Sequence, residues 1–168
     1  MKVSFAKQNL TNYISNIGKN VHLPNKYRNY TIYDEDQVDE ILSYGDKAIP
    51  YLNKVLQKSK DEKAICETLY IMNRMCDKYP EEIAKSYGYI SKFNNSDNPN
   101  IQVLLAGVYR KTMVPDGFGP LIRMLEKNIK DEDPKYFDAS EEIGGAILEY
   151  IKNYSSKETY AKFLKTKL

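Results

Sequence analysis

The feature that most constrains the fold is a short segment that occurs twice in the chain. Residues 45–56 read GDKAIPYLNKVL, and residues 116–126 read DGFGPLIRMLE. Each segment places aliphatic residues at helical spacing around a proline, which predicts two related amphipathic helices. One constant shift aligns an acidic residue, a proline and two aliphatic residues: Asp46 with Asp116, Pro50 with Pro120, Leu52 with Ile122, and Val55 with Leu125.

Pro50 interrupts an otherwise regular helical stripe formed by Ile49, Leu52, Val55 and Leu56. Proline is excluded from a helix interior, but it is accepted in the first turn, where backbone N–H groups have no partner within the helix. We therefore predict that a helix begins close to Pro50 and that this proline has a structural role at the corner between paired helices.

The rest of the chain also predicts helices, and no segment shows the alternation of a β-strand. Residues 19–33 lack a clear period and predict a long connection. Helix starts are marked by Ser59 with Glu62 as a capping box, Pro80, Asn98–Pro99, Asp116, either Asp133–Pro134 or Ser140, and Ser155 with Glu158. These signals predict an all-α chain of about nine helices: 3–17, 34–45, 45–56, 59–79, 80–93, 98–113, 116–129, 133–154 and 155–168.

The predicted helices recur with a regular period. The shift that carries Asp46 onto Asp116 equals two periods of about 35 residues each. Tyr70, Tyr109 and Tyr150 each end a stretch of small and aliphatic residues, at a slightly longer spacing, and we expect all three to be buried or half-buried. Helix pairs that recur at such a period are typical of an α-solenoid.

At residues 46–56 and 116–125 the chain resembles the HEAT-repeat family in its short bacterial form. In that family the second helix of each pair often begins with an acidic or small cap. Alanine follows, then isoleucine or valine, then proline, any residue and leucine, with another leucine one turn later. The resemblance covers residues 34–168, with residues 77–93 and 155–168 matching by period and position. It implies a right-handed α-α solenoid of about four HEAT-like helix pairs. Residues 1–33 would add an N-terminal helix and a connection packed on the first repeat, within a single structural domain.

Composition limits the compartment and the class of partner. The 168 residues include 25 basic and 23 acidic side chains, a balance that does not favour nucleic acid or an anionic membrane. We expect a cytoplasmic protein, because the sequence has neither a long uninterrupted apolar run nor the pattern of a signal peptide. Cys66 and Cys76 fall on one predicted helix, too far apart to be joined, so they predict two free, buried thiols.

No residue pattern indicates catalysis, a metal or a cofactor. His22 has no nearby cysteine or second histidine, and the acidic clusters fall mainly at helix starts, where they complement the helix dipole. Phosphate-binding glycine motifs are absent from the sequence, and Gly144–Gly145 predicts close packing between neighbouring helices. We therefore expect no enzyme activity, no cofactor and no metal site.

Tyr27, Tyr30 and Tyr33 recur every third residue in the predicted connection, with Lys26 and Arg28 between them. Aromatic side chains among cations can stack on bases and contact phosphates. The alternative is that the three tyrosines cover the open end of the first repeat, which is the interpretation we favour from the sequence.

The resemblance implies that the second helices of the pairs line a concave face. Their polar positions would then meet a partner, in pairs one helical turn apart that share one helix face. We predict a polar, mildly basic groove for an acidic or mixed-charge partner, formed by Asn53, Gln57, Lys85, Tyr89, Arg123 and Lys127.

The favoured function is a non-catalytic scaffold or adaptor that binds another protein or a peptide in this groove. One alternative is a nucleic-acid-binding protein, since some HEAT-like solenoids bind DNA, including a class of alkylpurine glycosylases. Those proteins use a strongly basic groove with tryptophans and a catalytic aspartate, whereas this chain has no tryptophan and a net charge of +2, so nucleic acid is disfavoured. A regulatory or immunity-type subunit for the product of a neighbouring gene is the third alternative.

Overall fold

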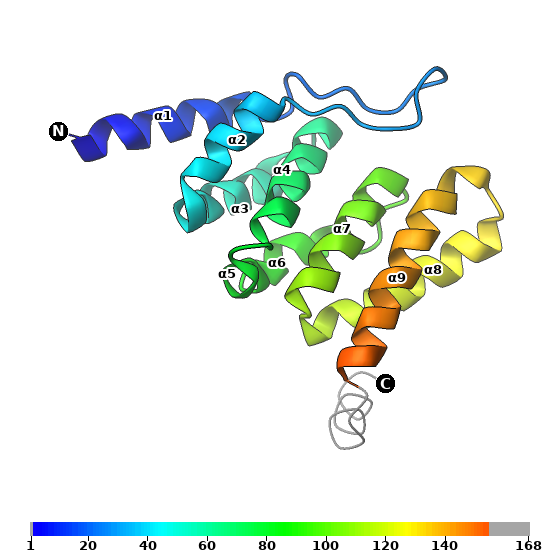
Figure 1. The fold of residues 1–168 in the computed structure, drawn as a ribbon. Helices are drawn as coiled ribbons and strands as arrows, with labels where there is room; N and C mark the ends of the chain where they lie inside the picture. Colours follow the sequence, from blue (N-terminus) through cyan, green and yellow to red (C-terminus); the bar gives the residue numbers. More distant parts are fainter. Residues whose placement is uncertain (1, 155–168) are drawn as a thin grey trace. The chain divides into compact units, whose positions relative to one another are not determined.

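The computed structural model describes residues 2–154, with only the backbone course given for residues 2–7; Met1 and residues 155–168 lie outside the described part. Within it the chain forms nine α-helices and no β-strand (Figure 1), which confirms the predicted all-α class. The helix predicted at 155–168 falls outside the described residues. The nine are α1 (Lys2–Asn16), α2 (Glu35–Ser43), α3 (Ile49–Lys58), α4 (Glu62–Met75), α5 (Pro80–Ala84), α6 (Tyr87–Ile90), α7 (Pro99–Thr112), α8 (Phe118–Asp131) and α9 (Phe137–Asn153).

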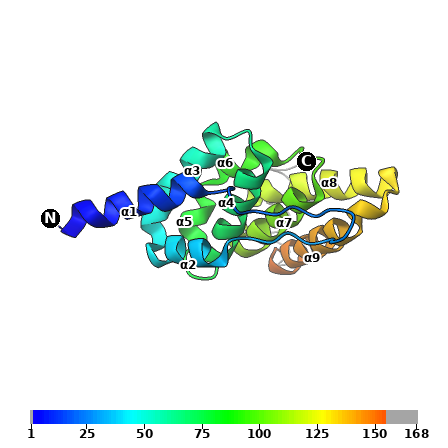
Figure 2. The same ribbon diagram turned by 90° about the horizontal axis from the view of Figure 1, so that it is seen from above.

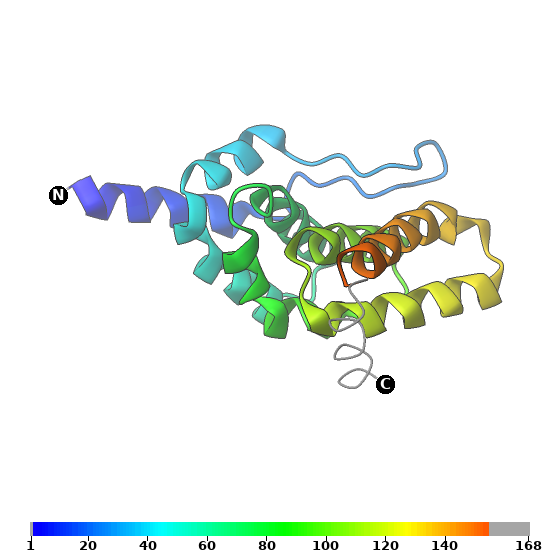
Figure 3. The same cartoon turned by 60° about the horizontal axis from the view of Figure 1, so that its bottom comes forward.

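The chain divides into two compact units between Tyr89 and Ile90. In the first unit, α4 packs against both α2 and α3. In the second unit, α9 packs against both α7 and α8, and α8 and α9 lie side by side in Figure 3. Thus α4 and α9 each cover the two helices that precede them, as happens where helix pairs succeed one another.

The two proline segments fold in the same way, although they belong to different units. A short 3-10 turn, Gly45–Ala48, leads into α3, and Pro50 lies in the first turn of that helix. A second 3-10 turn, Pro115–Gly117, leads into α8, where Pro120 also lies in the first turn. The predicted helix start at Pro50 is confirmed.

Two predicted helix caps are wrong. α4 begins after Asp61, whose Oδ1 accepts a hydrogen bond from the Lys63 N–H at 3.1 Å, while Ser59 Oγ accepts one from the Asp61 N–H. Asp61 is nearer to the helix and satisfies one amide of its first turn, so Ser59 supports the loop instead. Asp116 lies inside the 3-10 turn before α8, and the N-cap position of that helix is occupied by Gly117 instead.

The helix predicted over residues 80–93 is interrupted. It begins at Pro80 as predicted, but α5 ends at Ala84 and α6 begins at Tyr87. The Ser86 N–H donates to Ile83 O and the Tyr89 N–H donates to Ser86 O, so the break uses the tighter bonding of a 3-10 turn. Serine and glycine near the break have low helix propensity, which explains why the helix does not continue.

Two side chains predicted to be buried lie in the core of the second unit. Tyr109 and Tyr150 are 0% and 1% exposed, as expected from their place in the repeat, and Tyr70 of the first unit is half-buried. A Cβ atom added to Gly117 would lie 2.9 Å from Tyr109 Cγ and 2.7 Å from Tyr150 Oη. Gly117 thus lets the backbone approach both rings, whereas a Cβ at Gly144 would meet nothing within 4 Å. The close packing predicted at Gly144 is therefore wrong.

The predicted thiols are confirmed: Cys66 and Cys76 are free and buried. Burial raises the pKa of the Cys66 thiol to about 12, so this thiol is protonated at neutral pH. None of the helices within residues 2–154 is both long enough and apolar enough to span a bilayer.

The two glycines provide a matched test of the packing in the second unit. We expect Gly117→Ala to lower the free energy of unfolding by about 1–3 kcal/mol, because the added methyl group overpacks two buried rings. Gly144→Ala should raise it by up to about 1 kcal/mol, because alanine favours a helix interior over glycine. Urea unfolding followed by circular dichroism measures both, and equal effects of the two substitutions would contradict this packing.

Candidate functional site

Glu67 connects α4 to both ends of the long connection at residues 19–33. Its side chain is fully buried, and Oε2 accepts hydrogen bonds from the Gly18 N–H at 2.5 Å and from Gln37 Nε2 at 3.4 Å. The backbone N–H of Asp34 also lies close enough to stabilise the carboxylate. Oε1 is buried and has no partner among the described residues.

Gly18 reaches Glu67 because of its backbone conformation. Its φ of +87° lies in the left-handed region, and a Cβ there would come within 2.7 Å of the Ala64 backbone nitrogen. Glycine at this position both follows the end of α1 and lets the chain lie directly on α4. The hydrogen bond between Gly18 and Glu67, which we call the anchor, therefore requires a glycine at position 18 and a carboxylate at position 67.

The environment raises the pKa of Glu67 above its ordinary value of 4.5. Burial is the largest cause, and the negative charge of Asp34 adds to it. Hydrogen bonds from Gly18, Asp34 and Gln37 oppose the shift but do not cancel it.

Between these anchored ends, residues 19–33 form an extended, hairpin-like loop (Figures 1 and 2). His22 and Ile32 exchange two backbone hydrogen bonds of 3.0 Å, and Asn25 and Arg28 close the turn with a second pair. The Arg28 guanidinium donates to the backbone oxygens of three loop residues, His22, Leu23 and Tyr30. The loop is thus held by its own polar groups.

The three tyrosines of the loop have different environments. Tyr33, at the base, stacks on Tyr70 with ring centroids 4.0 Å apart, and burial raises its pKa. Tyr27 and Tyr30, at the tip, are 86% and 61% exposed. The packing interpretation thus holds for Tyr33 and fails for Tyr27 and Tyr30, which leave most of their ring surface in solvent.

Two cations accompany the exposed rings. Lys26 Nζ lies 4.7 Å from the centroid of the Tyr27 ring, and Arg28 Cζ lies 5.6 Å from that of Tyr30. We call residues 25–30 the tyrosine tip. Along the chain it lies midway between the two ends of the loop that Glu67 anchors.

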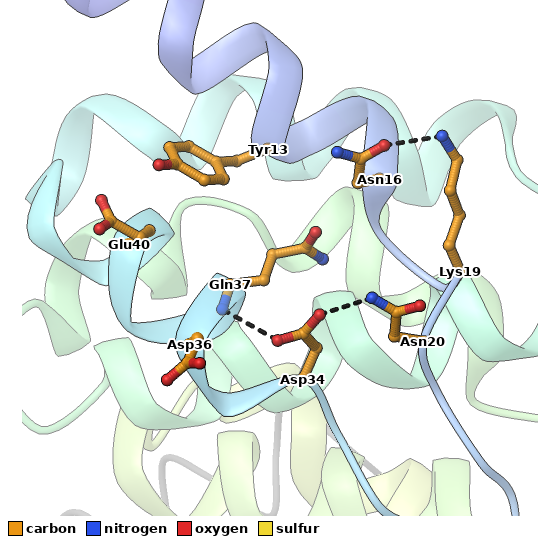
Figure 4. A pocket seen from close by; sticks show the side chains of 8 residues that line it. All are labelled: Tyr13, Asn16, Lys19, Asn20, Asp34, Asp36, Gln37 and Glu40. Atoms are coloured by element: carbon orange, nitrogen blue, oxygen red, sulfur yellow. Dashed lines mark hydrogen bonds between the residues drawn. The ribbon is translucent and has the colours of Figure 1, made fainter.

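A pocket lies at the base of the loop, between α1 and α2 (Figure 4). Asp34 caps α2 by accepting from the Gln37 N–H at 3.2 Å, and its second oxygen accepts from Asn20 Nδ2 at 2.7 Å. We call this space the α1–α2 pocket, and it is lined by Tyr13, Asn16, Lys19, Asn20, Asp34, Asp36, Gln37 and Glu40.

Carboxylates dominate the charge of the α1–α2 pocket. Three carboxylates line it, those of Asp34, Asp36 and Glu40. The one cation of the lining is Lys19, whose Nζ donates to Asn16 Oδ1 at 2.7 Å. The charge of Glu40 is the largest cause that raises the pKa of Tyr13, so the phenol keeps its proton.

The six residues predicted to line a groove occupy both units. In the first unit, Asn53 and Gln57 share one face of α3, and Asn53 is half-buried with no partner for its buried Oδ1 among the described residues. Lys85 is the C-cap of α5 and Tyr89 lies within α6, so the helix break separates them, and Lys85 pairs with Glu82 at 2.8 Å.

In the second unit, Arg123 and Lys127 are exposed on one face of α8, as predicted. Lys127 pairs with Asp97. The basic character of the predicted groove is thus reduced by these neighbouring carboxylates, and its continuity over all six residues stays a prediction.

The sequence interpretation missed Glu67 and the α1–α2 pocket. A lone carboxylate in the apolar run AICETLYIM was the available signal for Glu67. Asp36 and Glu40, one helical turn apart, were the signal for one wall of the pocket. Within residues 2–154, no group of three or more histidine, cysteine, aspartate or glutamate side chains is placed to hold a metal ion.

The raised pKa of Glu67 predicts a pH dependence of stability. The native protein keeps this proton to a higher pH than the unfolded chain, so the contribution of Glu67 to stability falls as the pH rises from about 4.5 through the raised pKa. Urea unfolding of the wild type and Glu67→Gln between pH 4 and 8 should show the variant gaining stability relative to the wild type as the pH rises.

Asp46→Asn controls for loss of one exposed negative charge in the same unit. A difference between wild type and Glu67→Gln that stays constant over this range would contradict the buried-carboxylate account.

Comparisons with models of protein families, with curated proteins and with solved structures find no match for this chain. The resemblance to HEAT repeats therefore rests on the residues that suggested it.

Proposed function

We propose that the protein is a non-catalytic scaffold that binds another protein, and that the tyrosine tip is a principal contact. The observation that carries this proposal is the exposure of Tyr27 and Tyr30, 86% and 61%, on a loop held by its own hydrogen bonds. Tyrosine is enriched in protein interfaces, because its large ring carries a polar group and loses little conformational freedom on binding.

The order of the loop supports this function. Hydrogen bonds to and from His22 and Arg28 hold the loop in one shape before any partner arrives. A preformed loop loses less conformational entropy on binding than a flexible one. Holding two large rings in water gives the isolated fold little benefit, whereas a partner that covers them gains their apolar area.

The proposal also includes the arrangement of the helices as a solenoid. We infer a HEAT-like solenoid from two recurring features. A 3-10 turn precedes both α3 and α8, with a proline in the first turn of each helix, and α4 and α9 each pack on the two helices before them. In such a fold Asn53, Gln57, Lys85, Tyr89, Arg123 and Lys127 would form a second contact surface, for an acidic or mixed-charge partner.

Nucleic acid is the second candidate partner, and the alternation of rings and cations at the tyrosine tip favours it. Single-stranded nucleic acid binds to exposed aromatic rings by base stacking and to nearby cations through its phosphates. The Arg28 guanidinium, however, already donates three hydrogen bonds within the loop, which leaves Lys26 as the main phosphate contact at the tip.

The test is affinity capture with the tagged wild type, Tyr27→Ala/Tyr30→Ala and Tyr89→Ala, each with and without nuclease. We expect one stoichiometric protein that survives nuclease and binds the double variant at least about tenfold more weakly. Tyr89→Ala distinguishes the predicted groove from the tip, because it removes an exposed ring outside the loop.

A second measurement tests nucleic acid directly. Fluorescence anisotropy with a labelled single-stranded oligonucleotide should show no salt-dependent binding that requires Tyr27 and Tyr30. Such binding, together with loss of captured proteins after nuclease, would show that the partner is a nucleic acid and not a protein. Equal capture by the wild type and the double variant would contradict the role of the tip.

A further inference from the structure

We propose that the exposed side of α9 binds the same side of a second copy of this chain, with the two helices antiparallel. The inference does not depend on what the tyrosine tip binds, because α9 belongs to the second unit. It rests on a row of apolar side chains that the fold leaves in water and on the order of the charges beside that row.

Three large apolar side chains of α9 point away from the core. The helix packs against α7 and α8 with its other side, yet Phe137, Leu148 and Ile151 are 72%, 67% and 44% exposed. Phe137, Gly144 and Ile151 are each about two helical turns apart, and Leu148 follows Gly144 by about one turn, so these four residues share one side of the helix. We call them the α9 face.

The α9 face is larger than the exposure that a monomer ordinarily tolerates. A single exposed leucine is common in folded proteins, whereas neighbouring large apolar side chains on one helix indicate a contact surface. Covering Phe137, Leu148 and Ile151 with a partner removes their apolar area from water, which is favourable. The face therefore fits a partner that is itself apolar at its centre.

The middle of the α9 face is open. A Cβ atom added at Gly144 would meet nothing within 4 Å among the described residues, and one at Gly145 would meet Arg110 Nη1 at 3.8 Å, an ordinary contact. Packing within the described chain thus requires glycine at neither position, although glycine weakens a helix relative to alanine. Because no side chain stands there, the backbone of a second helix can approach α9 closely.

The charges beside the α9 face indicate that the partner is a second copy. Asp138 and Glu141 lie in the first two turns of α9 and Lys152 lies in the last, and all three are exposed. When two copies of α9 cross at Gly144 in opposite directions, Lys152 of the second copy comes level with Asp138 of the first.

The same crossing brings the apolar side chains together. Phe137 and Ile151 lie at equal distances on either side of Gly144, so Ile151 of the second copy comes level with Phe137 of the first. The surface is thus complementary to itself in both charge and apolar pattern, as a two-fold dimer requires. In a parallel pair the acidic turns of the two copies would meet each other, which is unfavourable.

The other charged groups of α9 do not oppose this pairing. Glu142 pairs with Arg110 of α7 at 3.6 Å, so its charge is balanced within the chain. Lys152 lies 3.9 Å from Glu149, a loose pair in which the lysine side chain is largely in solvent. Such a surface pair contributes little free energy, so it leaves Lys152 able to turn toward a second copy.

The experiment is sedimentation equilibrium of the full chain, with the wild type, Leu148→Glu and Tyr27→Ala. We expect a monomer–dimer equilibrium of the wild type with a Kd of about 1–100 μM, because one helix from each copy makes a small interface. Leu148→Glu should weaken the dimer at least about tenfold, since it places a charge in the apolar row. Tyr27→Ala, which removes an exposed ring from the first unit, should leave the Kd unchanged.

Charge reversal tests the antiparallel arrangement. Asp138→Lys and Lys152→Asp should each weaken the dimer by about threefold to tenfold, because each contact occurs twice in a two-fold dimer. The double variant exchanges the two charges and should restore the Kd to within about twofold of the wild type. A double variant that binds no better than the single variants would overturn the arrangement.

A chain that stays monomeric up to about 500 μM overturns the proposal. Urea unfolding of Leu148→Glu then identifies what covers the face. A lower free energy of unfolding than the wild type would assign it to residues 155–168 of the same chain, and an unchanged one to another protein. A dimer that Tyr27→Ala dissociates and Leu148→Glu leaves intact would place the contact at the tyrosine tip and would also overturn the proposal.

Discussion

The buried carboxylate of Glu67 is the contact on which the first unit depends. It holds Gly18 after the end of α1 and Gln37 in α2, so two segments far from α4 in sequence are fixed to it by one side chain. Burial without a full set of partners costs free energy, as the raised pKa shows. Removing Glu67 would leave the buried Gly18 N–H without its acceptor, which is also costly.

Both candidate sites follow from this anchor. The loop at residues 19–33 begins after Gly18 and ends before Asp34, and the backbone N–H groups of both residues bond to Glu67 of α4. The tyrosine tip therefore extends from a base that is fixed to α4. The α1–α2 pocket lies at that same base, and Gln37 belongs to both the anchor and the pocket wall. A polar contact inside the fold thereby places an aromatic surface and an acidic pocket on one unit.

The sequence predicts those features that depend on residues close together along the chain. The helix start at Pro50, the cap at Asn98 and the burial of Tyr109 and Tyr150 follow from backbone rules and period, and the structure confirms them. Ser59 and Asp61 competed for one helix start, and the sequence does not show which side chain reaches the free amides. Contacts across long separations, such as Gly18 with Glu67, leave no periodic signal. The exposure of Tyr27 and Tyr30 could not be predicted either, because sequence period does not reveal which rings a loop leaves in solvent.

The most direct test of this account is hydrogen exchange of backbone amides in the wild type and in Glu67→Ala. The account predicts that the amides of Gly18, His22 and Ile32 exchange slowly in the wild type and at least about tenfold faster in the variant, while those of α7–α9 keep their protection. Loss of protection confined to the first unit would show that Glu67 holds the loop. Unchanged protection of His22 and Ile32 in the variant would contradict the central role of this carboxylate.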